Sequence, residues 1–415
     1  VYAVWAKDAN GPEEKPDEIP DYEEYSVTYD GNGADSGEVI DNALYPLDYE
    51  VTVKANAFQK ANYAFDGWKY TADGSEGEIW PTEKFTIKAD TTLYAHWEED
   101  IKGGEPDPEN PTNPDGKPDK YQTIFTYVSA GNGTVDPEGI EVHTTPRNET
   151  TGKYADKTPV SPSGSVATAN TGYAFDYWTA ESTLSSRAVN KDFHADMSVF
   201  KSDTYMEDTT FTAYFAEDKK GGGSDPDDPT VPDTPDDIPD KYQIIFRYVS
   251  ADETTGTVTG TVYELYTFGD RENGFREIGE GISPDPHVTP AHAEGYAFDY
   301  WTIEGNEEAK DYTEEMSNLS TKLYTTDTTF VANFAEDNGG GGDDGNDPDG
   351  IPDKYQIVFR YVSADTTKGI VMGTTFETHT FTDENGNYLE ASTVPTSPNA
   401  DVTVAALSGN AFDYW

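Results

Sequence analysis

The sequence predicts a mostly β protein, built as a tandem array of small domains that are joined by acidic linkers. A strand-like phrase, Tyr25-Ser-Val-Thr-Tyr29, returns in similar form from Tyr121, Tyr242 and Tyr355. An aromatic phrase follows each time, first as Tyr-Ala-Phe-Asp-Gly-Trp and later with the ending Phe-Asp-Tyr-Trp. Phrases that recur in a fixed order indicate like modules, and arrays of modules usually span distance or multiply weak contacts.

These phrases divide the 415 residues into three whole repeats and a partial fourth. Residues 1–5 match the closing phrase of a repeat, so further copies of the repeats are expected in a longer chain. We expect the last strand of a preceding repeat at 1–5, a linker at 6–20, repeat 1 at 21–99, a linker at 100–118, repeat 2 at 119–217, a linker at 218–239, repeat 3 at 240–336, a linker at 337–352 and an incomplete repeat 4 at 353–415.

Within a repeat the apolar residues follow a strand period. Ile244, Phe246 and Tyr248 alternate with their neighbours, and the closing phrase Thr329–Phe334 alternates in the same way. Such period-two runs of β-branched and aromatic residues are typical of strands. Helical periodicity is short, and residues 307–319 are its best candidate. We therefore expect mostly β domains (α+β) with at most one short helix each.

Between the repeats lie polar stretches without periodicity. They contain glycine runs and Asp-Pro steps, and each ends on a phrase such as Pro235-Asp-Asp-Ile-Pro-Asp240. Glycine gives flexibility, whereas proline and like charges extend the chain. We expect extended acidic Pro/Gly linkers, with repeats that unfold independently because their cores are separate.

The composition excludes several classes of protein. Lysine and arginine number 27 against 80 aspartates and glutamates, so the formal net charge of −53 would repel nucleic acid and anionic membranes. Aromatic residues make up 13% of the chain, which excludes a disordered acidic tail. No apolar run approaches the roughly 20 residues that cross a bilayer, so no membrane insertion is expected in this segment. The absence of cysteine fits a cell interior or a bacterial surface that does without thiols.

The aromatic phrase allows two interpretations. A functional one makes its tryptophan a platform for sugar stacking. The favoured one makes it a core residue, because aromatic burial contributes strongly to small cores. Strand alternation places Phe298 and Trp301 on opposite faces unless a bulge intervenes. The predicted core residues are Trp68, Trp178, Trp301, Phe65, Phe175 and Phe298.

The acidic lead-ins are weak candidates for calcium, which prefers carboxylate and carbonyl oxygens. They fit only the later part of the calcium-loop spacing, because Gly345 or Pro111 stands at the first ligand position, so solvated linker is favoured. The candidate calcium ligands are Asp347, Asp349, Asp353, Asn113, Asp115 and Asp119. We expect no other cofactor, no zinc at the six scattered histidines and no catalytic residues, since no nucleophile elbow or phosphate loop is present.

Residues 25–97 resemble the Listeria–Bacteroides repeat, the B-repeat of bacterial internalins. The matching phrases are Val27-Thr-Tyr-Asp-Gly-Asn-Gly33, Tyr63-Ala-Phe-Asp-Gly-Trp68 and Asp90-Thr-Thr-Leu-Tyr-Ala-His-Trp97. The later repeats keep the outer frame and insert about 14–17 residues between the first two phrases, so they look like longer relatives. The resemblance implies a β-grasp-like fold in a large bacterial cell-surface protein, and it implies no catalytic residues.

The expected function is therefore non-enzymatic. We expect an extracellular (secreted) repeat region on a bacterial cell surface, attached to the cell wall, that acts as a stalk for an adhesive or other distal domain. The alternative is that the repeats themselves are adhesin modules that bind a host or microbial glycan or protein. Exposed aromatic residues on the repeats would favour the alternative.

Overall fold

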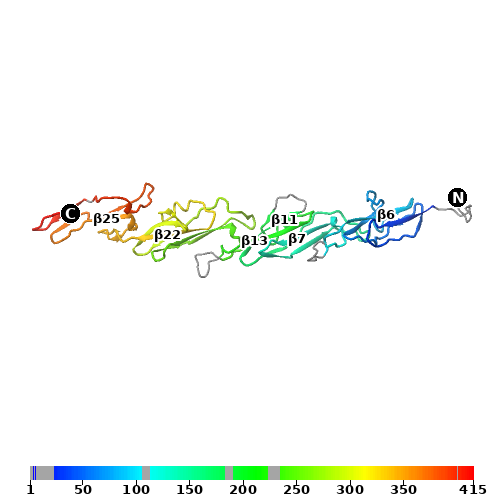
Figure 1. The fold of residues 1–415 in the computed structure, drawn as a ribbon, viewed down its shortest axis with the longest axis horizontal. Helices are drawn as coiled ribbons and strands as arrows, with labels where there is room; N and C mark the ends of the chain where they lie inside the picture. The colour runs from blue at the N-terminus through cyan, green and yellow to red at the C-terminus, as the bar shows by residue number, and fades with distance from the viewer. Residues whose placement is uncertain are drawn as a thin grey trace. The chain divides into compact units, whose positions relative to one another are not determined.

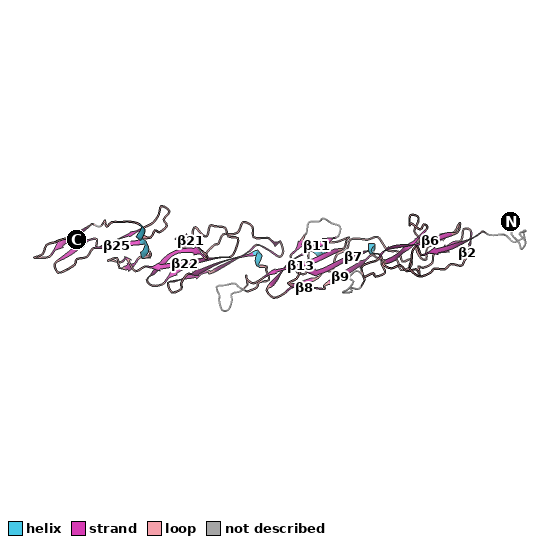
Figure 2. Ribbon diagram, viewed as in Figure 1, coloured by secondary structure: helices cyan, strands magenta, loops and turns pink. Residues whose placement is uncertain are grey.

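The computed structural model describes residues 3, 5, 23–104, 113–182, 190–222, 234–399 and 401–415. Strands dominate these residues and the helices are single turns (Figure 2), so the predicted mostly β class is confirmed. The chain separates into two compact units, residues 1–170 with 175–215 and residues 171–174 with 216–415. The predicted linker at 6–20 lies outside the described residues, as does most of the predicted strand at 1–5. No described helix has the length and apolar character needed to cross a membrane.

Repeat 1 is a mixed sheet with a small strand pair beside it (Figure 1). The sheet order is β2-β1-β6-β4, in which β1 runs parallel to β6 and β4 antiparallel to it. The strands are β1 Glu24–Asp30, β2 Leu44–Pro46, β3 Glu50–Thr52, β4 Tyr63–Lys69, β5 Lys84–Thr86 and β6 Thr91–Glu99.

Repeat 2 keeps this frame in a five-stranded sheet of order β12-β11-β13-β7-β9. Its first strand β7 again runs parallel to its last strand β13. The elements are the 3₁₀ turn η1 Asp119–Tyr121, β7 Gln122–Ser129, β8 Gly133–Asp136, β9 Gly139–Thr144, β10 Val166–Ala169, β11 Tyr173–Ser182, β12 Lys191–Asp192, η2 Phe200–Ser202 and β13 Thr209–Glu217.

Repeat 3 has the equivalent sheet, of order β16-β14-β22-β20-β21. Here β14 and β22 are the parallel first and last strands. The elements are η3 Asp240–Tyr242, β14 Gln243–Ser250, β15 Gly256–Gly260, β16 Tyr263–Thr267, β17 Gly269–Asp270, β18 Gly274–Phe275, β19 Val288–His292, β20 Tyr296–Ile303, β21 Asn306–Asp311 and β22 Thr328–Glu336.

Repeat 4 consists of two separate two-stranded sheets, β25 with β27 and β26 with β28. Among its described residues, no strand pairs with β25 in the way that β22 pairs with β14. The elements of this part of the chain are β23 Gly340–Gly341, β24 Asp347–Pro348, η4 Asp353–Tyr355, β25 Gln356–Arg360, β26 Gly369–Gly373, β27 Phe376–Thr380, η5 Ala391–Thr393 and β28 Val402–Ala406.

The core of each complete repeat is aromatic. Trp68, Trp178 and Trp301 are each 0% exposed, and their indole N–H groups donate to main-chain carbonyls 3.0–3.2 Å away. The register of β20 shifts between Phe298 and Tyr300, so a bulge does intervene in the aromatic phrase. The bulge turns Phe298 and Trp301 toward the same core, where their rings lie 6.0 Å apart.

Two expectations differ from the structure. Residues 307–319 form no helix, because residues 306–311 pair with β20 as β21. Three of the segments predicted as extended linkers, 100–118, 218–239 and 337–352, have described ends that lie side by side. Gly103 bridges Pro114, Gly221 bridges Pro235, and β23 pairs with β24.

Candidate functional site at the repeat junctions

The aspartate of the aromatic phrase is buried in the three complete repeats, although carboxylates are seldom buried without a partner. Asp66 and Asp299 are each 3% exposed and stand at the strand bulge, where the shift in register turns them away from the aromatic core. A buried carboxylate must be paired or hydrogen-bonded to persist as an anion. In both cases its partners come from the repeat that follows.

In the first unit, η1 of repeat 2 supplies these partners to repeat 1. The Lys120 ammonium lies 2.5 Å from Asp66 Oδ2, and the Tyr121 hydroxyl lies 3.4 Å from the same oxygen. Lys120 also donates to Glu98 at the end of β6, at 2.8 Å. One lysine therefore joins two carboxylates of the preceding repeat.

In the second unit, η4 of repeat 4 does the same for repeat 3. Lys354 pairs with Asp299 Oδ2, and the Tyr355 hydroxyl donates to Asp299 Oδ1 at 2.6 Å. We call this arrangement of a buried aspartate with the lysine and tyrosine of the next repeat the clasp. Its presence in both units shows that the recurring Asp-Lys-Tyr lead-in is an interaction site.

Titration behaviour follows from these contacts. Burial alone would lower the pKa of Lys120, but the hydrogen bonds to Asp66 and Glu98 raise it above its ordinary value. Burial and the Asp299 carboxylate raise the pKa of Tyr355. Burial and Asp66 raise the pKa of Tyr121 to about 12. Lys120 is therefore charged, and Tyr121 and Tyr355 are neutral donors at neutral pH.

Aromatic rings surround each clasp. Tyr121 stacks on Tyr154 with ring centroids 4.8 Å apart, and Tyr355 stacks on Tyr388 at 4.9 Å. In the first unit, Lys153 of repeat 2 also pairs with Glu78 of repeat 1 at 2.8 Å. The tyrosine that contacts the buried aspartate is thus itself held by a stacked ring in both units.

A second buried aspartate closes each linker loop. Asp100, Asp218 and Asp337 directly follow the last strand of a repeat and are 0–3% exposed. Each accepts two backbone N–H groups from the far end of its linker, at 2.8–3.2 Å. Burial raises the pKa of Asp100 and of Asp218. The three linkers thus share one closure although their lengths differ.

A glutamine at the start of each first strand completes the closure. Gln122, Gln243 and Gln356 donate from Nε2 to an aspartate of the lead-in at 2.7–2.9 Å. Gly103 allows this approach, since it has φ +89° and an added Cβ would lie 2.6 Å from Gln122 Oε1. A side chain at this position would collide with the closure.

The predicted calcium ligands are placed in these closures but not brought together as a cation site. Asp115, Asp119, Asp349 and Asp353 accept N–H groups of their own loops, and Asn113 bonds Gly104 through its main-chain carbonyl. Asp347 is exposed in β24. Within the described ranges, the group of side chains spaced for a metal is Asp66, His96 and Glu98, and the Lys120 ammonium already bridges two of them.

The predicted core phenylalanines also differ in burial. Phe175 and Phe298 are buried, whereas Phe65 is half-buried and packs against the core of repeat 1. The clasp itself was missed by sequence reasoning. Its signal was the recurrence of Asp-Lys-Tyr in three lead-ins of a chain that has few lysines.

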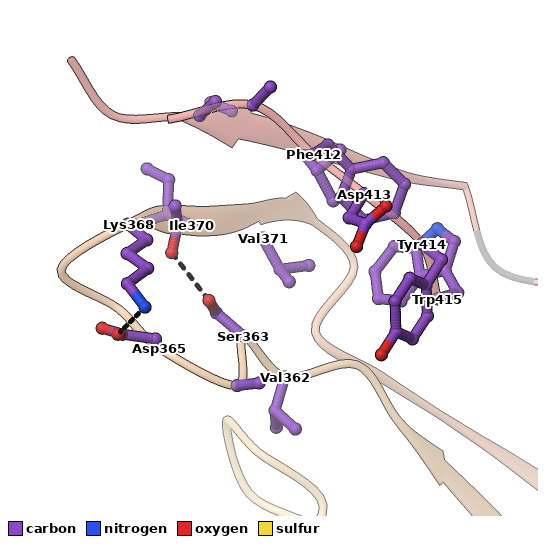
Figure 3. Close-up of a pocket in the computed structure, with 16 residues that line it drawn as sticks. Val362, Ser363, Asp365, Lys368, Ile370, Val371, Phe412, Asp413, Tyr414 and Trp415 are labelled. Atoms are coloured by element: carbon purple, nitrogen blue, oxygen red, sulfur yellow. Dashed lines mark hydrogen bonds and ion pairs between the residues drawn. The ribbon is translucent and has the colours of Figure 1, made fainter. Parts of the chain in front are cut away.

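Repeat 4 contains an apolar pocket of about 360 Å³ (Figure 3). Val362 and Ile370 line it together with the aromatic phrase Phe412–Trp415, whose Trp415 is 62% exposed. The corresponding Trp301 of repeat 3 is completely buried, and its strand β20 pairs with the closing strand β22. The aromatic phrase of repeat 4 has no such strand partner among the described residues and is exposed.

Comparison with known proteins concerns mainly repeat 1. Residues 25–96 match the family model of the Listeria-Bacteroides repeat domain. Repeat 1 is a Listeria-Bacteroides repeat. A protein of Evansella cellulosilytica named "Putative membrane protein" is 37% identical over 75 residues, which are 18% of this chain and 11% of that protein. No solved structure matches the chain. The matched residues thus include Asp66, the buried acceptor of the clasp, and end two residues before Glu98.

Proposed function

We propose that this chain is a non-enzymatic, extracellular repeat region of a bacterial surface protein, attached to the cell wall, that acts as a stalk for an adhesive or other distal domain. The observation that carries the proposal is the clasp. In both units, the buried charged groups join one repeat to the next, with their hydrogen-bonding capacity directed at the neighbouring repeat. A chain that fixes consecutive modules in this way is suited to spacing.

The repeat family and the named relative support a place at the cell surface. The net charge of −53 supports solubility at high local density. A β-grasp-like fold is supported by the mixed sheets with parallel first and last strands at their centres. We assign no catalytic role to any residue.

The alternative adhesin function has one observation in its favour. A cleft of about 390 Å³ lies between repeats 1 and 2 in the first unit. Its lining includes Trp80, Arg147, Asn148 and Tyr154, a mixture of aromatic and hydrogen-bonding groups that suits a sugar.

A distance measurement tests the stalk. The chain has no cysteine, so spin labels can be placed specifically at Glu38→Cys in repeat 1 and Glu138→Cys in repeat 2. A stalk requires a narrow distance distribution that Lys120→Met broadens and Lys84→Met, a change at an exposed surface pair, leaves unchanged. A broad distribution in the parent chain would overturn the proposal. Glycan binding that Arg147→Ala abolishes would establish the adhesin alternative instead.

A further inference from the structure

The strands through which the chain enters and leaves each complete repeat lie next to each other and parallel. These are β1 and β6, β7 and β13, and β14 and β22. In every case they occupy interior positions of the sheet, with a further strand on each outer side. From this arrangement we infer that the repeats have a further function, which is to bear tension, and that the closed linkers are reserves of length.

Repeat 3 shows how tension would act. Five residue pairs join β14 and β22, from Phe246 opposite Thr328 to Ser250 opposite Ala332. The chain enters at Gln243 and leaves at Glu336, and these points are about 35 Å apart along the strand axis. Tension therefore pulls the two strands in opposite directions along their length. All the hydrogen bonds of this pair are loaded together rather than one after another.

The neighbouring strands prevent repeat 3 from unfolding by the peeling of a single strand. Strand β16 pairs with β14 over five residues, and β20 pairs with β22 over most of its length. Neither load-bearing strand is at an edge, so it cannot peel away without breaking a second ladder. Resistance to forced unfolding is set by the unfolding barrier, and simultaneous rupture of a ladder raises that barrier.

Because the clasp joins neighbouring repeats directly, tension passes through the clasp rather than along the linker. In the second unit the chain leaves β22, is held at Asp337 and re-enters at Asp353, while Lys354 and Tyr355 hold Asp299 of repeat 3. A few side-chain hydrogen bonds and ion pairs hold this joint between the repeats, whereas complete ladders of backbone hydrogen bonds hold each repeat together. The joint should open first and release the residues between Asp337 and Asp353, which can extend by roughly 50 Å.

This inference deepens the stalk proposal and rests on it only for the origin of the tension. The test is single-molecule pulling of the full chain between an N-terminal attachment and one engineered cysteine. Glu336→Cys loads repeat 3 in shear, whereas Thr326→Cys, two residues before β22, opens the same two strands from one end. Both residues are exposed, and repeats 1 and 2 serve as the internal force standard.

We expect repeat 3 to need at least twofold more force through residue 336 than through residue 326. Equal forces would overturn the load-bearing assignment. In the Glu336→Cys chain we also expect a short extension at low force before repeats 1 and 2 unfold. Lys120→Met should lower the force at which this short extension occurs, and Lys84→Met should not. If Lys120→Met leaves that step unchanged, the clasp does not guard the linker. If the stalk proposal is wrong, the distance distribution between repeats 1 and 2 will be broad, whereas the unfolding forces of the repeats will be unaffected.

Discussion

At the scale of single residues, the aspartate of the aromatic phrase explains how the repeats join. Burying a carboxylate costs several kcal/mol unless a cation and hydrogen-bond donors compensate it. Asp66 gains Lys120 and Tyr121, and Asp299 gains Lys354 and Tyr355. Repeats 1 and 3 therefore each carry a buried charge that is stabilised by the repeat that follows.

Replacing Lys120 should weaken the first unit. Lys120→Met keeps the aliphatic stem but leaves Asp66 buried without a cation. We expect a loss of about 1–3 kcal/mol, below the usual value for a buried pair because the lysine itself is 41% exposed. Urea unfolding of residues 21–217 measures the loss. Lys84→Met, which breaks only an exposed pair with Glu50, is the control. Equal stabilities of the two variants would contradict this role of Lys120.

The core tryptophan of repeat 3 should contribute far more. Trp301→Ala removes a completely buried ring from the core, and we expect a loss of about 3–5 kcal/mol, enough to unfold a marginal domain. Thermal melting of the full chain measures the effect. Tyr414→Ala, at a side chain that is 79% exposed, should leave the midpoints unchanged. A Trp301 variant with an unaltered midpoint would place the indole outside the core.

Glu78 should make the first junction sensitive to acid. Burial opposes its ionisation, but hydrogen bonds from Lys153, Trp80 and Lys69 lower its pKa from 4.5 to about 2. Because the folded pKa is depressed, the stabilisation is fully present above pH 4.5 and is lost as the pH falls toward 2. With allowance for solvent screening we expect about 1–2 kcal/mol.

Melting midpoints between pH 2 and pH 6 test this expectation. Glu78→Gln should remove part of the decline in midpoint below pH 4.5, and Glu50→Gln at the exposed pair should not. Identical pH profiles for the two variants would show that Glu78 does not link the junction to pH.

At the scale of the elements, local patterns predicted the strands, whereas contacts distant in sequence could not be predicted. Period-two alternation correctly indicated the strand that became β14, since its apolar side chains face one core. Residues 307–319 have a helical spacing, but pairing with β20 and the Asp311 carboxylate, which binds the N–H groups of Asn318 and Leu319, hold a strand and a turn instead. The clasp joins residues 54 apart, Asp66 and Lys120, and no local pattern reveals such a partner.

The bulge has a visible cause in repeat 1. Gly67 has φ +95°, and an added Cβ would lie 3.1 Å from the Trp80 indole, which covers this position. The other repeats carry tyrosine there, such as Tyr300, whose ring lies 5.7 Å from that of Tyr312. The glycine of the Listeria-Bacteroides repeat therefore accompanies the extra tryptophan that packs over it.

The two-stranded sheets of repeat 4 should exchange amide hydrogens faster than their counterparts. Strand β25 has one neighbour, whereas β14 has two and is buried in a five-stranded sheet. We expect protection of residues 356–360 in the isolated chain to be at least tenfold lower than that of residues 243–247. Hydrogen exchange at a dilution that keeps the chain monomeric measures this ratio. Equal protection would mean that repeat 4 is stable without a strand equivalent to β22.

At the scale of the whole molecule, we expect neighbouring repeats to be coupled in stability within each unit. The separate cores predict independent unfolding, whereas the clasp and the linker closure connect one repeat to the next. A fragment that ends at the boundary of a repeat lacks both the clasp and the linker closure. The degree of coupling is therefore a property of the junction rather than of the core.

An isolated fragment of residues 240–337 should melt about 5–15 °C below the same repeat in the full chain. Cutting there leaves Asp299 without Lys354 and Tyr355, a loss of about 1–3 kcal/mol. A longer fragment, residues 240–361, keeps the lead-in with both residues and should recover most of the midpoint. Equal midpoints for the short fragment and the full chain would show that the repeats unfold independently after all.

The closed linker bases have a consequence for how such chains can change. Because Asp100 and Asp337 hold the two ends of their linkers together, residues inserted between those ends would leave the junction within each unit intact. Loops anchored at both ends tolerate insertion well. The three linkers differ in length while keeping one closure, as this tolerance allows. Each closure is therefore a natural grafting point, where an epitope or a whole guest domain could be presented at regular intervals along the array.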